Sequence, residues 1–181
     1  MTGAVGGTLC YPFLPKMPRE GKQAGTETPA TELLKQHLVR YAEHVYDYVD
    51  KGGTAASSAA LGFDEHAVVK TLVMEDENKV PLLVLMHGDQ QVSLKALARE
   101  LGKKRVEPCK PEVAQRHTGY LVGGTSPFGT KKPLEVCCEA TIAELPMLYI
   151  NGGKRGFLVA LAPADLIRVL KPRIVHCAQQ G

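Results

Sequence analysis

Two glycine-rich segments bordered by basic side chains are the parts of this sequence best suited to bind a ligand. Residues 119–132 read Gly-Tyr-Leu-Val-Gly-Gly-Thr-Ser-Pro-Phe-Gly-Thr-Lys-Lys, and residues 151–156 read Asn-Gly-Gly-Lys-Arg-Gly. Because glycine has no Cβ, such loops let backbone N–H groups approach a partner closely. The neighbouring lysines favour a partner with negative charge. We expect a short apolar strand to lead into the first loop. The alternative is a plain surface turn, since Gly-Gly and Ser-Pro are ordinary turn residues.

Lys70 interrupts an apolar run, residues 67–74, that has strong strand propensity. Alternation along a strand places Lys70 on one face with Val68, Leu72 and Met74. A lysine among such neighbours must reach water or a polar partner. It is either a solvated residue of an edge strand or a fixed cation for a phosphate or a developing oxyanion. Together with the two loops, the second alternative predicts a concave site for an anionic ligand.

Other catalytic patterns are missing from the sequence. Neither loop matches the phosphate loop G-x-x-x-x-G-K-[ST] or the dinucleotide fingerprint G-x-G-x-x-G. The six histidines and five cysteines show no metal-ligand spacing, so we expect no metal. The adjacent Cys137 and Cys138 would point to opposite faces of a strand. We expect packing cysteines in a reduced, cytoplasmic protein, with a thiol-based enzyme that uses one of these two residues as the alternative.

The composition is that of an ordinary globular domain. The chain has 181 residues, of which 44% are hydrophobic and 23% charged. This length suits one domain with a sizeable core, and no apolar run approaches the length of a membrane helix. The net charge of +3 is too small to mark the whole protein as a nucleic-acid binder, so a basic footprint must be local. Basic residues cluster at 103–105, 131–132, 154–155, and at 171 and 173. The second and third of these clusters border the glycine loops, which favours a phosphate-bearing partner.

Several helices and strands are needed to position these residues. We expect an irregular leader over residues 1–27 and one domain over residues 28–177. Helices are predicted at about 29–40, 54–61, 94–101, 111–117 and from Pro163 onward, and strands at 45–49, 67–74, 80–86, 134–138, 147–150 and 157–161. Short connections within 67–86 and 147–161 imply antiparallel pairs. The predicted fold class is α+β, with a curved, mixed, mostly antiparallel sheet surrounded by helices.

Several motifs together resemble the YbaK/EbsC family, the free-standing relatives of the editing domain inserted in bacterial prolyl-tRNA synthetases. The matching segments, in the family's order, are residues 69–72, 114–116, 118–124, 126–127 with Gly129, and 152–156. The resemblance implies a single YbaK-like domain that hydrolyses mischarged aminoacyl-tRNA, above all Cys-tRNA(Pro). Cys-tRNA(Cys), or a tRNA carrying another small group such as Ala, is the alternative. The implied partners are the 3′ end of aminoacyl-tRNA and prolyl-tRNA synthetase, with no cofactor.

The resemblance also assigns roles to individual residues. Lys70 matches the family's essential lysine, and the Gly-x-x-x-Pro signature falls on Gly123 to Pro127. Lys70, Gly123 and Gly124 are therefore the expected catalytic residues, with the loop amides, including that of Gly124, holding the substrate carbonyl and the terminal adenosine. The expected substrate-binding residues are Tyr46, Thr71, Thr125, Ser126, Pro127, Phe128, Gly129, Gly152, Gly153, Lys154, Arg155 and Gly156. No protein nucleophile is expected, since in YbaK-type enzymes the thiol of the cysteinyl group is thought to attack the ester.

Two features depart from the family pattern. Leu158 stands where relatives often carry an acidic residue, and residues 51–60 lack the aromatic and acidic side chains expected around the acceptor pocket. These departures favour a second hypothesis, a non-catalytic module that binds tRNA or a nucleotide on the same fold.

Overall fold

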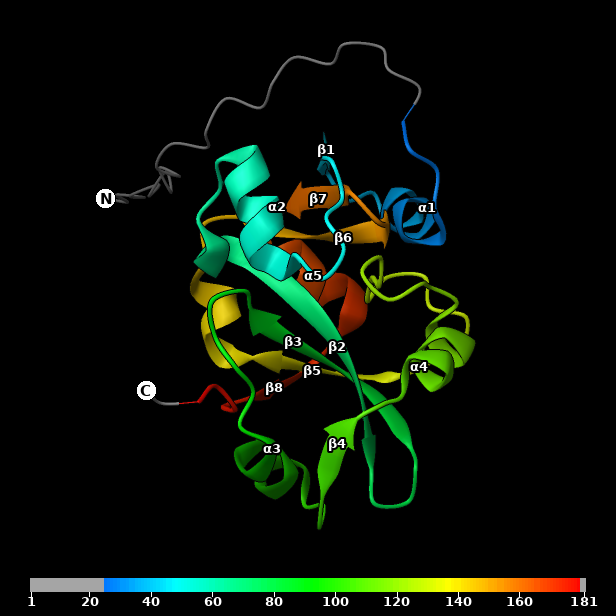
Figure 1. The fold of residues 1–181 in the computed structure, drawn as a ribbon, viewed down its shortest axis with the longest axis vertical. Coiled ribbons are helices and arrows are strands. Elements are labelled where there is room, and N and C mark those ends of the chain that lie inside the picture. The colour runs from blue at the N-terminus through cyan, green and yellow to red at the C-terminus, as the bar shows by residue number, and fades with distance from the viewer. Residues whose placement is uncertain (1–24, 180–181) are drawn as a thin grey trace, which may run out of the picture.

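An eight-stranded mixed sheet organises residues 25–179, the part of the chain that this computed structural model describes (Figure 1). The expected leader lies outside the described residues except for residues 25–27. The strands are β1 (Ala42–Val45), β2 (Val68–Asp76), β3 (Pro81–His87), β4 (Val106–Pro108), β5 (Glu135–Glu139), β6 (Leu148–Lys154), β7 (Phe157–Leu161) and β8 (Arg173–Val175). Their order is β1-β7-β6-β2-β3-β5-β8, and β4 pairs with β2.

Antiparallel pairs outnumber parallel pairs in this sheet. The pairs β1–β7, β6–β7, β2–β3 and β2–β4 are antiparallel, whereas β2–β6, β3–β5 and β5–β8 are parallel. The predicted class, a mixed and mostly antiparallel sheet with helices, is therefore confirmed. Both hairpins expected from short connections, β2–β3 and β6–β7, are present.

Five α-helices and two short 3₁₀ helices surround the sheet in the described residues. They are α1 (Pro29–Gln36), α2 (Gly53–Leu61), α3 (Leu94–Leu101), α4 (Pro111–Thr118), α5 (Pro163–Leu170), η1 (Glu65–Ala67) and η2 (Ala140–Glu144). Their ends follow the sequence signals. The hydroxyls of Thr28 and Ser93 cap α1 and α3, and Gly62 and Gly102 end α2 and α3 in the left-handed conformation.

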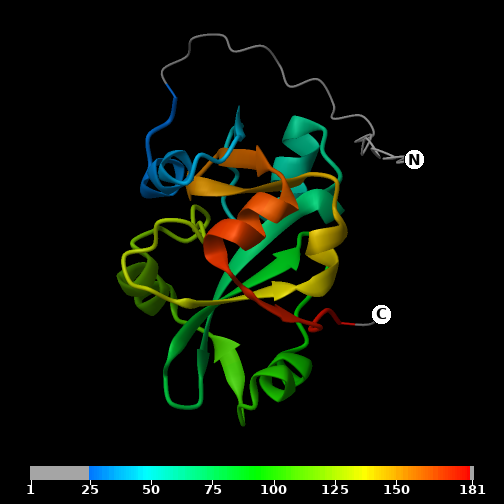
Figure 2. The ribbon, with the colours of Figure 1, turned by 180° about the vertical axis from the view of Figure 1, so that it is seen from behind.

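The two faces of the sheet carry separate apolar clusters. One cluster gathers α1, α5 and Phe128 against β3, β6 and β7, and Figure 2 shows α5 lying across this face. The other packs α3 against β2 and β3. β3 is buried on both sides, as its continuous apolar run predicts. Cys138 joins the first cluster and Cys137 the second, which confirms that they point to opposite faces.

Three segments near the site differ from the predicted elements. β1 ends at Val45, so the predicted strand is wrong for residues 46–49. Val45 pairs with Phe157, the first residue of β7, and the next rung would fall on the β6–β7 turn. Residues 120–122 form no strand either. The second glycine-rich segment is mostly strand, because β6 continues to Lys154 with an irregular register after Asn151.

Candidate active site

A cavity of about 690 Å³ opens where β2 passes between α2 and the loop that follows α4 (Figure 1). Its floor is residues 68–73 of β2. Its walls come from residues 46–57, from the glycine loop at Gly123, from the β6–β7 turn at Arg155, and from the start of α4. This volume lies within the range that holds a small organic ligand.

The cavity lies at a gap in the sheet. β6 pairs with β2 only at Val68 and Val69, and β4 pairs with β2 only from Met74 onward. The carbonyl of Val73 accepts a hydrogen bond from the Cys109 N–H on this edge at 3.0 Å. Because peptide groups alternate in direction along a strand, the N–H and C=O of Thr71 point to the same open edge.

Thr71 is therefore well placed to bind a polar ligand. β3 pairs with it on the opposite edge, but no strand of the described residues pairs with it on this one. Its buried Oγ1 has no hydrogen-bond partner in that part of the chain. Buried polar groups are rarely left unpaired in native proteins. The N–H and C=O groups of Thr71 thus offer one donor and one acceptor at the cavity floor, next to its unpaired hydroxyl.

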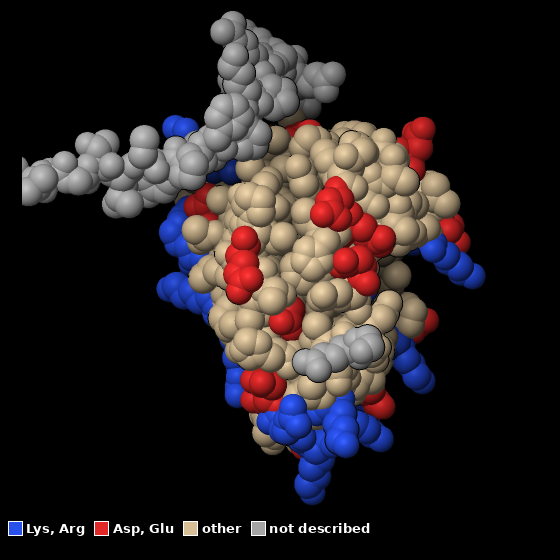
Figure 3. All heavy atoms as spheres, turned by 90° about the vertical axis from the view of Figure 1, so that its left-hand side faces the viewer, with Lys and Arg blue, Asp and Glu red and all other residues tan. Residues whose placement is uncertain are grey.

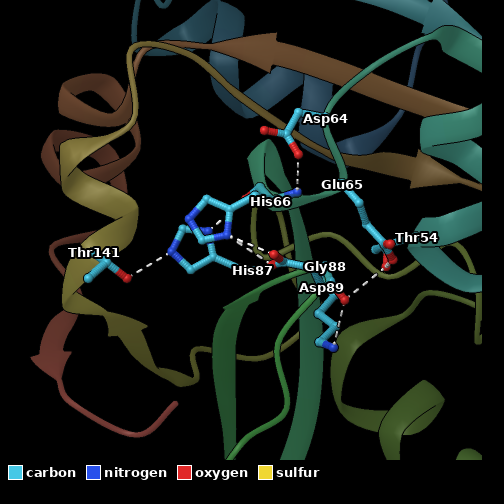
Figure 4. Close-up of polar contacts among 9 residues, drawn as sticks. Thr54, Asp64, Glu65, His66, His87, Gly88, Asp89 and Thr141 are labelled. Atoms are coloured by element: carbon cyan, nitrogen blue, oxygen red, sulfur yellow. Dashed lines mark hydrogen bonds and ion pairs between the residues drawn. The ribbon is translucent and has the colours of Figure 1, made fainter. Parts of the chain in front are cut away.

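Lys70 is held as a fixed cation beside Thr71. Its Nζ donates to the carbonyl of Gly88 at 3.1 Å, and the hydroxyl of Thr54 donates to Glu65 Oε1 at 2.8 Å (Figure 4). Burial lowers the pKa of Lys70, while the Glu65 and Asp89 carboxylates act to raise it. β2 is not an edge strand, because it lies between β6 and β3 in the sheet, although its side toward β6 and β4 is open between Val69 and Met74.

The turn after β3 positions the Gly88 carbonyl. Buried His87 bonds through Nδ1 to the His66 carbonyl at 2.6 Å and through Nε2 to the Thr141 hydroxyl at 2.8 Å. The ring of His66 stacks on His87 at 3.8 Å and pairs with Asp89 at 2.9 Å (Figure 4). A side chain at Gly88 would lie 2.7 Å from the Glu65 carbonyl, so only glycine fits there.

These contacts predict a pH-dependent stability. Burial lowers the pKa of His87, so below the unfolded value of about 6.5 the unfolded chain binds more protons than the folded one. Neutral His87 therefore contributes fully to the free energy of unfolding above the unfolded pKa of about 6.5. This contribution is lost as pH falls from there through the lower pKa of the folded state. We expect urea unfolding to show that wild type loses more stability than His87→Gln between pH 7.5 and 5.5, by up to about 1.4 kcal/mol. Parallel pH profiles for the two proteins would contradict this role.

The glycine loop supplies backbone amides, although not all of those expected. Gly123 lines the cavity with φ +88°, and an added Cβ would approach the Tyr48 hydroxyl at 2.5 Å. The Gly124 N–H donates to the Leu121 carbonyl at 2.9 Å, so the prediction that this amide faces the substrate is wrong. Within residues 25–179, no hydrogen bond uses the N–H of Gly123 or Thr125, and both residues line the cavity.

The rest of the loop lies underneath. Ser126, Pro127 and Phe128 are buried and do not line the cavity. The Tyr120 hydroxyl donates to the Phe128 carbonyl at 2.7 Å, and Gly129 passes directly against the backbone of Pro29. These residues hold the loop in place, and direct contact with a substrate stays a prediction for Gly123 and Thr125.

The second glycine-rich segment locks the first. Asn151 Nδ2 donates to the Gly123 carbonyl at 3.1 Å, and Arg155 Nε donates to the Val122 carbonyl at 2.8 Å. The Arg155 guanidinium also lies 5.1 Å from the centre of the Tyr48 ring. Of the predicted residues in this segment, only Arg155 lines the cavity. Gly152, Gly153, Lys154 and Gly156 shape the hairpin behind it.

Tyr46 and Leu158 also line the cavity. Contact of Tyr46 with a substrate stays a prediction, and Leu158 forms an apolar part of the wall with 4% of its surface exposed. Sequence reasoning missed the roles of Thr54, Glu65 and Asn151. Asn151 opens the second glycine-rich segment, so its position was a signal, whereas nothing local marked Thr54 or Glu65.

The buried thiols are poorly suited to nucleophilic attack. Burial raises the pKa of Cys137 to about 11 and that of Cys138 to about 12, and neither lines the cavity. Cys109 does line it, with a pKa raised to about 11 by burial and by Glu75. Nucleophilic cysteines have lowered pKa values instead, so the geometry does not favour the thiol-based alternative.

The described part of the chain offers neither a metal-ligand cluster nor a membrane-spanning helix. Residues 25–179 contain no cluster of three or more His, Cys, Asp or Glu side chains that could hold a metal ion. None of the helices in this part of the chain combines the length and apolar character that crossing a bilayer requires.

Comparison with known proteins places the chain in a family. The family described as the aminoacyl-tRNA editing domain matches residues 51–169. The chain is 31% identical over 147 residues to EbsC of Enterococcus faecalis, whose name proposes a Cys-tRNA(Pro)/Cys-tRNA(Cys) deacylase, covering 81% of this chain and 90% of EbsC. It is 27% identical over 163 residues to the multifunctional Ser/Thr-tRNA deacylase ProXp-y of Escherichia coli, covering 88% and 97% of the two chains.

A solved structure supports the same fold. A protein described as a proposed trans-editing enzyme for prolyl-tRNA synthetase superposes with a TM-score of 0.73 at 20% identity, covering 86% of this chain and all of the other. A proline–tRNA ligase of Brachyspira hyodysenteriae is 27% identical over 86 residues, which span 15% of the ligase and 48% of this chain. The family match spans the cavity floor, the glycine loop and the β6–β7 turn. This chain therefore belongs to the aminoacyl-tRNA editing domain family and is an enzyme of the tRNA deacylase type.

Proposed function

We propose that the cavity binds the 3′ end of a mischarged aminoacyl-tRNA and hydrolyses its ester, with Cys-tRNA(Pro) as the preferred substrate. One observation carries the proposal: a fixed cation, Lys70, adjoins the unpaired edge of Thr71 in the cavity that the amides of the glycine loop also border. The similarity to EbsC over 90% of its length supports the choice of aminoacyl group.

The chemistry needs positioning and charge stabilisation rather than a protein nucleophile. Thr71 hydrogen-bonds the aminoacyl group, and the N–H groups of Gly123 and Thr125 stabilise the oxyanion that forms on the ester carbonyl together with the Lys70 cation. Such donors act most strongly in a site that excludes water. In wild type they are in place before the substrate binds, since strands and the β6–β7 turn hold them.

With a cysteinyl substrate, the substrate's sulfur is the nucleophile. The thiol loses its proton and attacks the ester carbonyl carbon, so a C–S bond forms and the C–O bond to the ribose breaks. The ribose oxygen takes up a proton, and water then opens the cyclic thioester to give free cysteine. This step adds chemical selectivity to a cavity that discriminates small side chains weakly by size.

The aminoacyl group is tested by comparing Cys-, Ser-, Ala- and Pro-tRNA(Pro) under single-turnover conditions. We expect Cys-tRNA(Pro) to react at least about tenfold faster than Ser-tRNA(Pro), because removal of the thiol removes the internal nucleophile. Equal rates for serine and cysteine would contradict the thiol step and favour water attack.

A deacylase for hydroxyl amino acids is the second candidate. The similarity to ProXp-y over 97% of its length favours it, and preferential hydrolysis of Ser-tRNA would support it.

A non-catalytic module predicts salt-sensitive RNA binding with no turnover of any substrate. We also propose prolyl-tRNA synthetase as the partner that supplies tRNA selection in the cytoplasm, on the basis of the similarity to part of proline–tRNA ligases.

A further inference from the structure

A second hollow, of about 300 Å³, lies on the other side of α4. Pro111 and Ala114 of α4 line the first cavity. The second hollow is lined by Glu75, Lys79, Lys110, Val113, Arg116 and His117. α4 therefore separates the two, and they are roughly one helix diameter, about 10 Å, apart.

The second hollow combines several cations with few carboxylates. Lys79 is neutralised by Glu75 at 2.7 Å and by Glu107 at 2.8 Å. Lys110 and Arg116 are exposed and form no ion pair within residues 25–179. These two side chains are thus free to bind an anion.

Two more lysines adjoin the C-terminal end of α4. The N–H groups of Lys131 and Lys132 donate to the carbonyls of Thr118 and His117 at 2.9 and 3.1 Å. Burial lowers the pKa of His117, and the charges of Lys132 and Arg116 lower it further. The Nδ1 atom of His117 is buried without a hydrogen-bond partner in the described residues.

The side of the molecule drawn in Figure 3 has a different distribution of charge. Figure 3 shows a side of the molecule where acidic side chains spread over the middle and basic ones gather at the lower end, toward α3 and β4. At that end Lys103 is paired with buried Asp76 at 2.8 Å, and Arg105 is within 3.6 Å of Glu107. At α4, by contrast, Lys110 and Arg116 have no ion pair in the described residues and line a hollow that lies one helix away from the first cavity.

We propose that this hollow binds backbone phosphates of the tRNA acceptor strand, a few nucleotides before the terminal adenosine. The proposal rests on the proposed function, because it assumes that the 3′ end occupies the first cavity. A separation of about 10 Å corresponds to about three nucleotides of a stacked strand, which rises about 3.4 Å per nucleotide along its axis. Lys110 and Arg116 contact phosphates and position the strand, without reading its sequence.

The test measures binding of uncharged tRNA(Pro) by fluorescence anisotropy as a function of salt. The double variant Lys110→Glu/Arg116→Glu is expected to raise Kd at least tenfold and to reduce the slope of log Kd against log salt by about 2. The matched control is Lys95→Glu/Lys104→Glu, two exposed lysines without ion pairs near α3, which changes net charge equally and is expected to retain the wild-type slope. Lys110→Gln/Arg116→Gln, which introduces no repulsion, is expected to give the same reduction in slope with a smaller rise in Kd.

The proposal would be overturned if both α4 variants kept the wild-type salt slope. It would also be overturned if the Lys95→Glu/Lys104→Glu control lost as much tRNA affinity and slope as Lys110→Glu/Arg116→Glu. The readout does not depend on catalysis. A protein that loses tRNA binding through the α4 variants but releases no amino acid would contradict the proposed deacylation and leave the phosphate site standing. If the wild-type enzyme hydrolyses Cys-tRNA(Pro) and the α4 variants bind tRNA as tightly as wild type, the phosphate site is contradicted and the proposed deacylation stands.

Discussion

Replacement of Lys70 by alanine is expected to lower the single-turnover rate of Cys-tRNA(Pro) hydrolysis by about 10²- to 10³-fold. This is the usual loss when one donor to a developing oxyanion is removed. Lys70 directly precedes Thr71 in β2, and its Nζ is held on the Gly88 carbonyl at 3.1 Å. A methyl group at this position supplies neither charge nor hydrogen bond. The measurement is release of labelled cysteine from preformed Cys-tRNA(Pro).

Two further variants separate catalysis from folding. Because burial lowers the pKa of Lys70, the folded state disfavours its charge, and Lys70→Met should keep or raise the melting temperature while abolishing activity. Lys104→Ala removes an exposed lysine near β4 and should react within about threefold of wild type, as surface substitutions usually do. A Lys70→Met protein that retains full activity would contradict the assigned role.

Replacement of Gly124 by alanine is expected to lower kcat/KM by about 10- to 100-fold, although the Gly124 amide does not face the substrate. An added Cβ would lie 2.9 Å from the Arg155 nitrogen and 3.1 Å from the Lys154 carbonyl carbon. Both are backbone atoms, so the loop must move away from the β6–β7 turn. A displacement approaching 1 Å costs about 10²-fold when it moves groups that align a reaction. Steady-state kinetics on Cys-tRNA(Pro) measures the loss.

Gly102→Ala is the matched control for this substitution. Gly102 has φ +66° at the end of α3, and nothing lies within 4 Å of an added Cβ. The change should therefore cost about 1 kcal/mol of stability through backbone strain and leave kcat/KM unchanged. If Gly124→Ala also left kcat/KM unchanged, close packing of the loop on the β6–β7 turn would not be needed for catalysis.

Much of the fold could be predicted because its signals are local. Thr28 with Pro29, and Ser93 with Gly102, mark helix ends through capping chemistry that depends on a few neighbouring residues. The continuous apolar run of β3 predicts a strand buried on both faces. Lys70 was identifiable for the opposite reason, since a cation inside an apolar strand needs a specific partner.

Other parts of the site depend on contacts between distant segments. The segment after Val45 has strand-forming residues, but β7 starts at Phe157, and beyond the bond from the Tyr46 N–H to the Gly156 carbonyl no strand pairs with it. The free edge of Thr71 arises because β6 and β4 pair with β2 at its two ends only. The Thr54–Glu65 contact joins α2 to the turn before β2. Local propensity contains no information on any of these arrangements.

The most direct measurement of the central claim is the rate at which wild-type protein in excess releases cysteine from Cys-tRNA(Pro) at pH 7.5. Thr71, Lys70 and the free loop amides together predict hydrolysis at least about 10²-fold faster than in buffer. They also predict that the product is free cysteine and intact tRNA, because only the ester is broken. A rate equal to that in buffer, with tRNA bound to the protein, would contradict catalysis by this cavity.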